Sequence, residues 1–142
     1  RKFYLESGMI IALFAFAFAG GAHGLDSSLL SSLLQGDDGV FSAEAPGKWS
    51  GKEKSHAPTA EIVGTQLAIS VEHSSMTVEH LVSDIIVLNE KRQVVASAVL
   101  QLDTPAKYSV DMGVLALSGS KSVTPYAYCN LHGMWKGNTV LL

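Results

Sequence analysis

Hydrophobic and polar positions divide the chain into three stretches with different periodicity. Residues 8–22 are apolar without a charge, residues 26–36 repeat leucines at helical spacing, and from residue 60 onward short runs alternate between apolar and polar side chains. An unbroken apolar stretch suits a membrane, a 3.6-residue period suits an amphipathic helix, and alternation suits a strand with one buried face. We therefore expect three units, at residues 1–24, 25–50 and 51–142.

The apolar stretch at residues 8–22 follows Arg1 and Lys2. A secretory signal has a basic start, an apolar stretch and a small-residue cleavage site, and this stretch offers all three. A membrane span needs about 20 apolar residues, which are reached when residues 3–5 are included. We expect a retained transmembrane helix within residues 1–24. Because positive residues precede it, we expect the rest of the chain on the non-cytoplasmic side, in a periplasm or an organelle such as the thylakoid lumen.

Four leucines recur at helical spacing between Asp26 and Gly36. Aspartate is a favoured N-cap and glycine a favoured helix stop, so the sequence predicts a short amphipathic helix within residues 25–50. Two interpretations of its apolar face are open. The face packs either on a membrane or another subunit, or on the domain of its own chain. Residues 37–51 are rich in Gly, Asp, Ser and Pro, which is typical of a linker.

Residues 51–142 show the pattern of an all-β domain. Leu67, Ile69 and Val71 would share one face of a strand. A series of short strands separated by turn residues is typical of an immunoglobulin-like β-sandwich, here preceded by the transmembrane helix and the short amphipathic helix. Further strands are predicted at residues 80–88, 93–102, 108–117, 122–128 and 138–142.

Composition narrows the chemistry. The net charge of −3 and the small charged fraction of 16% argue against a nucleic-acid partner, which would require a basic surface. The single cysteine, Cys129, excludes an intrachain disulfide and any Cys₄ metal site. Of the five histidines, only His23 lies outside the predicted β domain that holds Cys129.

Cys129 and His132 stand three residues apart, so one loop can direct a thiolate and an imidazole at one metal ion. This pair of donors selects iron, copper or zinc rather than magnesium or calcium. Spacing alone leaves open a buried cysteine beside an unrelated histidine. His73 and His80 stand at the end of one predicted strand and the start of the next, where a single loop can direct both inward. His56 precedes the first strand.

Three segments resemble motifs of the superoxide reductases, the family of neelaredoxin and of the iron domain of desulfoferrodoxin. Residues 127–136 (AYCNLHGMWK) resemble that family's CNxHGxW motif. Residues 73–80 (HSSMTVEH) resemble its HPMTxEH stretch, and Trp49 with residues 53–58 (EKSHAP) resembles its W…EKHxP segment. The three motifs occur in the family's order and cover residues 49–136.

The resemblance implies reduction of superoxide to hydrogen peroxide at a mononuclear, non-haem iron, with electrons from an external donor. Cys129 thiolate would occupy one axis, and the opposite position would stay open or hold the carboxylate of Glu53. Lys54 would attract the superoxide anion. An open position on a redox-active metal allows a small oxidant to bind. The imidazoles in a plane around the iron would come from His56, His73, His80 and His132.

The sequence also departs from the family. The two histidines of the middle motif are separated by one residue more than usual, Ser74 replaces a proline, and Asp84 stands near the place of a tryptophan. Ser55 separates Lys54 from His56, which changes the spacing that sets the direction of this lysine. The metal ligands are therefore retained more closely than the residues that handle the substrate.

Two other metals are alternatives. A cupredoxin site would use Cys129, His132 and His80 with Met134 as a weak axial ligand. That assignment leaves His56 and His73 unused, and it places the methionine only two residues after the histidine. Zinc is satisfied by four ligands, so one of the five donors would be left over. The number and kind of the donors favour iron.

A third interpretation is not enzymatic. The expected anchor, the Leu/Ser helix and the altered motifs are compatible with an accessory subunit of a photosynthetic or respiratory membrane complex, with a degenerate metal site. The membrane and other subunits of the complex would then be its partners. Because such complexes generate superoxide, this interpretation is compatible with iron binding.

Overall fold

A computed structural model describes residues 25–142 of the chain. The transmembrane helix expected within residues 1–24, and His23 with it, lie outside the described residues. Between residues 25 and 142, every helix is too short or too polar to cross a membrane.

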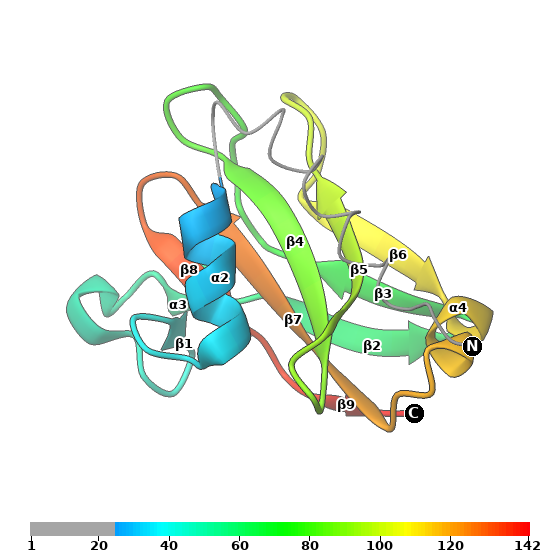
Figure 1. Cartoon of the computed structure of the whole chain (residues 1–142). Helices are drawn as coiled ribbons and strands as arrows, with labels where there is room; N and C mark the ends of the chain where they lie inside the picture. Colours follow the sequence, from blue (N-terminus) through cyan, green and yellow to red (C-terminus); the bar gives the residue numbers. More distant parts are fainter. Residues whose placement is uncertain (1–24) are drawn as a thin grey trace.

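The described chain folds into two β-sheets, with one helix across the larger sheet and shorter helices at the ends, as Figure 1 shows. Every neighbouring strand pair is antiparallel except the first two strands of the larger sheet, which are parallel. The mainly-β architecture is thus confirmed. The larger sheet has the order β1 (Phe41–Ser42), β8 (Gly133–Lys136), β7 (Ser122–Cys129), β4 (Val82–Asn89) and β5 (Val94–Val99), with β9 (Val140–Leu141) pairing with β7. The smaller sheet has the order β2 (Thr59–Val63), β3 (Gln66–Ser70) and β6 (Lys107–Asp111).

β4 is buried at every position because it lies inside the larger sheet and has both faces covered. Ile85 and Val87 face the smaller sheet and join the main core with Leu67 and Ile69 of β3. Ile86 and its neighbour Leu88 face the other way, into a second apolar cluster. A strand covered on both faces reads as a continuous apolar run, which is why alternation is lost in β4 and kept in β3.

The second cluster forms beneath the amphipathic helix α2 (Ser27–Gln35). Asp26 caps this helix by accepting a hydrogen bond from the Leu29 N–H, and Leu30 and Leu33 are buried. The predicted helix is therefore confirmed, and it packs on its own domain, lying across the larger sheet in Figure 1.

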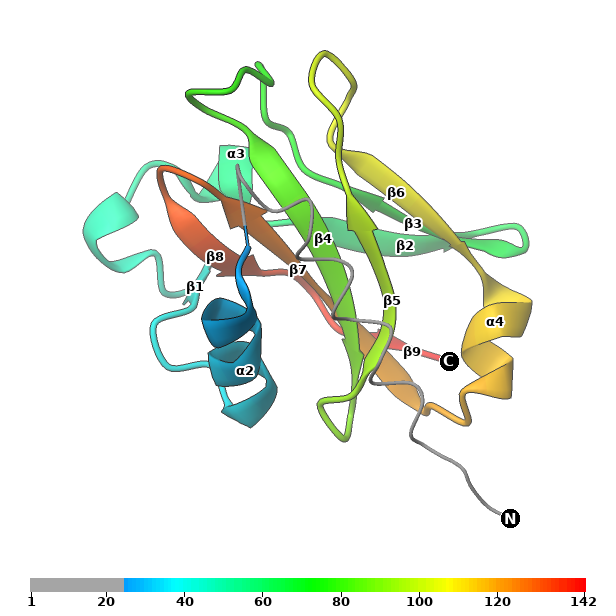
Figure 2. The same ribbon diagram turned by 45° about the horizontal axis from the view of Figure 1, so that its top comes forward.

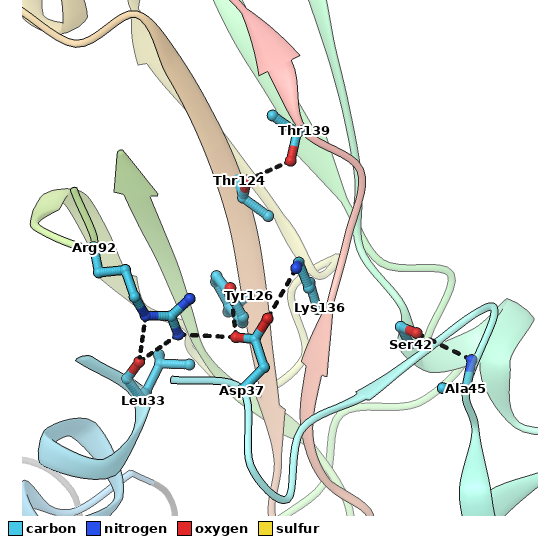
Figure 3. A network of polar contacts seen from close by, with 9 residues as sticks. All are labelled: Leu33, Asp37, Ser42, Ala45, Arg92, Thr124, Tyr126, Lys136 and Thr139. Atoms are coloured by element: carbon cyan, nitrogen blue, oxygen red, sulfur yellow. Dashed lines mark hydrogen bonds and ion pairs between the residues drawn. The ribbon is translucent and has the colours of Figure 1, made fainter. Parts of the chain in front are cut away.

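The segment expected as a linker packs against the larger sheet. β1 pairs with β8, and the ring of Phe41 lies 5.4 Å from that of Trp135. Asp37 accepts hydrogen bonds from Arg92, Tyr126 and Lys136, each 2.8 Å long (Figure 3). Arg92 also donates to the Leu33 carbonyl at the end of α2. One carboxylate thus holds the helix end, β7 and β8 together.

The sequence-based prediction of a strand at residues 108–117 is wrong in its second half. β6 ends at Asp111, whose side chain accepts from the Gly113 N–H, and a short helix, α4 (Met112–Leu117), follows. The periodicity of so short an apolar run does not distinguish a strand from a helix. The N-cap hydrogen bond of Asp111 favours the helix. The short strands β2 and β8 were not predicted as strands from the sequence.

Asp37 provides a test of this polar network. Burial by itself raises the pKa of Asp37, but hydrogen bonds from Lys136, Arg92 and Tyr126 outweigh it and lower the pKa from 3.8 to about 2. A lowered pKa stabilises the fold at pH above about 4, and this contribution is lost as the pH falls through about 2. Because the side chain is partly exposed, we expect Asp37→Asn to lower the free energy of unfolding at pH 7 by only about 1 kcal/mol.

Denaturant unfolding of both proteins at pH 7, 4 and 2.5 measures this effect. The difference between wild type and Asp37→Asn should be largest at pH 7 and should shrink toward pH 2.5. Asp38→Asn changes the exposed neighbouring carboxylate and serves as the control. Equal stability of the Asp37 and Asp38 variants at pH 7 would show that the network contributes nothing.

Candidate metal centre

Four histidines and the cysteine gather at one end of the sandwich, away from α4. The helix α3 (Glu53–His56) supplies His56, and the loop between β3 and β4 supplies His73 and His80. The end of β7 supplies Cys129, and the turn into β8 supplies His132. Figure 2 shows α3, the β3–β4 loop and the β7–β8 turn at the same end of the molecule.

Asn130 ties two of these segments together. Its amide nitrogen donates to the carbonyls of Val78 and Glu79, and its amide oxygen accepts from the Leu81 N–H. The Asn130 N–H also donates to the Leu81 carbonyl. These four bonds fix the β7–β8 turn against the loop that carries His80. In the sequence Asn130 is only the second residue of the CNxHGxW motif, and its hydrogen bonds could not be predicted from that position.

The side chains converge closely. The Nε2 atoms of His73 and His80 lie 3.0 Å apart. Cys129 Sγ lies 3.6 Å from His132 Nδ1, and the His132 ring centroid lies 4.5 Å from that of His56 and 4.9 Å from that of His80. A metal ion would find one donor atom from each of four residues within 4.8 Å of one another: His56, His73, His80 and Cys129. His132 adjoins this group without belonging to it by that distance.

Hydrogen bonds on the far side of two rings direct their lone pairs into the group. His56 Nδ1 lies 2.8 Å from the Ser55 hydroxyl and 3.1 Å from the Lys52 carbonyl. The carbonyl can only accept, and the hydroxyl donates to that same carbonyl, so these contacts favour the proton on Nδ1. The opposite nitrogen, His56 Nε2, is buried without a hydrogen-bond partner among the described residues. His73 Nδ1 likewise donates to the Ser75 carbonyl. A buried, unpaired His56 nitrogen beside the close nitrogens of His73 and His80 fits a bound cation.

The electrostatic environment favours the neutral form of three imidazoles, those of His56, His73 and His132. Burial is the largest cause of the low pKa of His56. Together with repulsion from the other imidazoles it outweighs the hydrogen bond to the Lys52 carbonyl and lowers this pKa from 6.5 to about 4. Burial is also the largest cause of the lowered pKa of His73 and of His132. Neutral imidazole is the form that binds metals, so these three residues are able to coordinate at neutral pH.

Cys129 is the deepest member of the group and is only 1% exposed. Burial raises the pKa of its thiol, while the backbone N–H groups of Leu131 and His132 donate to the sulfur and act in the opposite direction. A cation bound in the group would favour the thiolate further.

Two tryptophans enclose the cluster. Trp49 meets the His132 ring edge-on, with the ring centroids 4.6 Å apart. Trp135 is fully buried, its ring lies 5.6 Å from that of His56, and its Nε1 donates to the His132 carbonyl at 3.0 Å. Trp49 of the first motif and Trp135 of the last motif therefore hold the imidazoles in place.

The two residues assigned to substrate handling lie elsewhere on α3. Glu53 Oε1 accepts from the Gly51 N–H at 2.7 Å. Glu53 and Lys54 line an open hollow of about 440 Å³ together with Glu44 and Glu72, and none of the four histidines or the cysteine lines it. The structure therefore brings the five expected ligands together and places Glu53 and Lys54 at a neighbouring hollow.

The copper alternative depends on Met134, which the structure places in the apolar cluster beneath α2. This methionine is buried with Leu30 and Leu33 of the helix. His56 and His73, which a copper site would leave unused, lie inside the cluster of donors. The arrangement therefore does not match a cupredoxin ligand set.

Comparison with known proteins gives a consistent result. The family described as desulfoferrodoxin matches residues 48–138. The superoxide reductase (neelaredoxin) from Ignicoccus hospitalis is 16% identical with a TM-score of 0.53, covering 72% of this chain and 93% of that chain. The one-iron superoxide reductase from Giardia intestinalis is 23% identical with a TM-score of 0.50, covering 63% and 99% respectively. At these identities the two structures share the fold with this chain. No curated protein matches it.

Proposed function

The chain belongs to the desulfoferrodoxin family, and from this premise we propose that it is a one-iron superoxide reductase. One observation carries the proposal, the convergence of four imidazoles on a buried thiol. The proposed reaction combines superoxide with one electron and two protons to give hydrogen peroxide. The electron comes from a donor outside residues 1–142, because their single cysteine cannot form a Cys₄ iron site.

The donor set fits a mononuclear, non-haem iron. Iron bound here would supply the single electron that reduces superoxide. A thiolate with several imidazoles is too large a set for zinc, which is satisfied by four ligands. The proposed ligands are Cys129, His56, His73, His80 and His132.

The residues around the ligands have roles that follow from their contacts. The Lys52 and Ser75 carbonyls hold His56 and His73 with their lone pairs facing inward. The N–H groups of Leu131 and His132 stabilise negative charge on the sulfur and so adjust how strongly it donates. Trp49 and Trp135 limit the access of water to the imidazoles.

The strand order supports assignment of the sandwich to the immunoglobulin-like class. β2, β3 and β6 form one sheet, and β5, β4, β7 and β8 are consecutive in the other. These positions correspond to strands A, B and E facing C′, C, F and G of that class. The extra pairing of β1 and β9 extends the larger sheet at its ends.

We further propose that residues 1–24 anchor the domain to a membrane, on its non-cytoplasmic side and beside a membrane complex. The uncharged run at residues 8–22, behind two basic residues, supports this proposal. Extraction of membranes with alkaline carbonate should leave the full chain in the pellet and release a chain that begins at residue 25. Release of both would refute the anchor without affecting the proposed chemistry.

The activity has a direct test in the purified full chain. Elemental analysis should find stoichiometric iron. In stopped-flow experiments with superoxide and a reductant, the protein should consume superoxide without releasing oxygen. Colour is not sufficient, because copper–thiolate and iron–thiolate sites both absorb visible light. Zinc or copper in place of iron, or release of oxygen, would refute the proposal.

A further inference from the structure

The helix α3 presents lysines in two different directions. Lys52 is its N-terminal flanking residue and stands four positions before His56, whereas Lys54 stands two positions before it. Residues four apart lie on one face of a helix, and residues two apart lie on different faces. His56 points into the cluster of donors, so Lys52 lies on the side of the cluster and Lys54 on the side of the hollow.

Backbone hydrogen bonds fix Lys52 at the rim of the cluster. Its N–H donates to the Trp49 carbonyl at 2.8 Å, and its carbonyl accepts from His56 Nδ1 at 3.1 Å. Trp49 in turn meets the His132 ring edge-on. Lys52 is therefore held between two residues that both contact the imidazoles.

Lys52 is also close to the cluster along the chain, because its carbonyl lies 3.1 Å from His56 Nδ1. Lys52 is exposed, so its ammonium group is accessible to solutes. The lysine thus places an exposed cation beside the segment that carries His56.

Lys54 lies in an environment of opposite charge. The hollow is also lined by three glutamates, Glu44, Glu53 and Glu72, and by one further lysine, Lys136, whose charge is paired with Asp37. These carboxylates oppose the attraction of Lys54 for an anion. The hollow contains no member of the donor cluster, so an anion drawn to it would not be delivered to the proposed metal.

We propose that Lys52, rather than the Lys54 of the motif, is the lysine that draws the anionic substrate to the metal centre. This inference rests on the proposed function and assigns a steering residue within it. A small anion approaches a chain of net charge −3 against the overall field, so a local cation at the rim raises its concentration there.

The experiment compares Lys52→Ala, Lys52→Arg and the matched control Lys54→Ala in the full, iron-loaded chain. We expect Lys52→Ala to lower the second-order rate constant for superoxide by about tenfold at low ionic strength and to flatten its dependence on salt. Lys52→Arg should restore both properties because it restores the charge. Lys54→Ala should keep the rate and the salt dependence of the wild type.

A second readout is independent of turnover. Azide is a small monoanion, and its binding to the oxidised, iron-loaded protein is followed by visible absorption. We expect weaker azide binding in Lys52→Ala and wild-type binding in Lys54→Ala. A loss confined to Lys54→Ala, or wild-type rates and azide binding in Lys52→Ala, would overturn the assignment.

The two proposals fail in different ways. If the wild type binds iron without consuming superoxide, the proposed activity fails, and the azide titration still decides whether Lys52 draws anions to the metal. If the wild type consumes superoxide and Lys52→Ala does so equally fast with the same salt dependence, only the role of Lys52 fails.

Discussion

Replacement of Cys129 by serine is expected to abolish the metal centre, with iron content falling to background and the visible absorption of the oxidised protein disappearing. Serine is close to cysteine in size, so the substitution removes the sulfur while leaving the core filled. Its hydroxyl does not ionise near neutral pH, and the absorption of an iron–thiolate site requires the thiolate. The sulfur is also the deepest donor, 1% exposed, with backbone donors aimed at it.

The control for this prediction lies in the same turn. Leu131 is 54% exposed, so Leu131→Ala should retain iron and colour. Thermal unfolding of the metal-free Cys129→Ser protein, followed by circular dichroism, should show a cooperative transition like that of the metal-free wild type. Full iron content together with unchanged absorption in Cys129→Ser would remove the basis for the proposed centre.

Trp135→Ala is expected to lower the free energy of unfolding by about 3–5 kcal/mol, the usual cost of truncating a buried aromatic side chain. Trp135 is fully buried, packs against Phe41 and donates to the His132 carbonyl. The cavity would therefore open beside β1 and beneath the turn that carries a proposed ligand. Denaturant unfolding of the metal-free protein, followed by circular dichroism, gives the value.

Trp135→Phe separates packing from hydrogen bonding. It keeps an aromatic ring but removes the Nε1–H donor, so we expect a smaller loss, with about 1 kcal/mol attributable to the hydrogen bond. Leu141→Ala, at a side chain that is 79% exposed, should change stability little. If Trp135→Ala were as stable as the Leu141 variant, the tryptophan would not support the turn.

The strands with one buried face were predictable from the sequence because their periodicity is local. Leu67 and Ile69 alternate with partly exposed residues, as expected for β3. The end of β6 was not predictable, because the capping bond from Asp111 competes with strand extension and does not alter the hydrophobic pattern. The network around Asp37 was also missed, since its partners lie 55, 89 and 99 residues away in the chain.

The proposed metal ligands could be predicted from the sequence because each lies in a short motif with recognisable spacing. The structure brings together the histidines that precede β2 and β4 and the cysteine that ends β7. The direction of the lysines could not be obtained in the same way. Ser55 lies between Lys54 and His56, and only the helical geometry of α3 shows which side of the helix each lysine faces.

The bonds of Asn130 would affect how the protein takes up the proposed metal ion. Because the β7–β8 turn and the loop with His80 are joined by four hydrogen bonds, neither needs to be ordered when an ion arrives. Uptake then costs little conformational entropy, unlike in small domains that fold only around their metal. Affinity for competing ions is therefore decided by the chemistry of sulfur and nitrogen donors, and exchange of one ion for another can proceed in the folded protein.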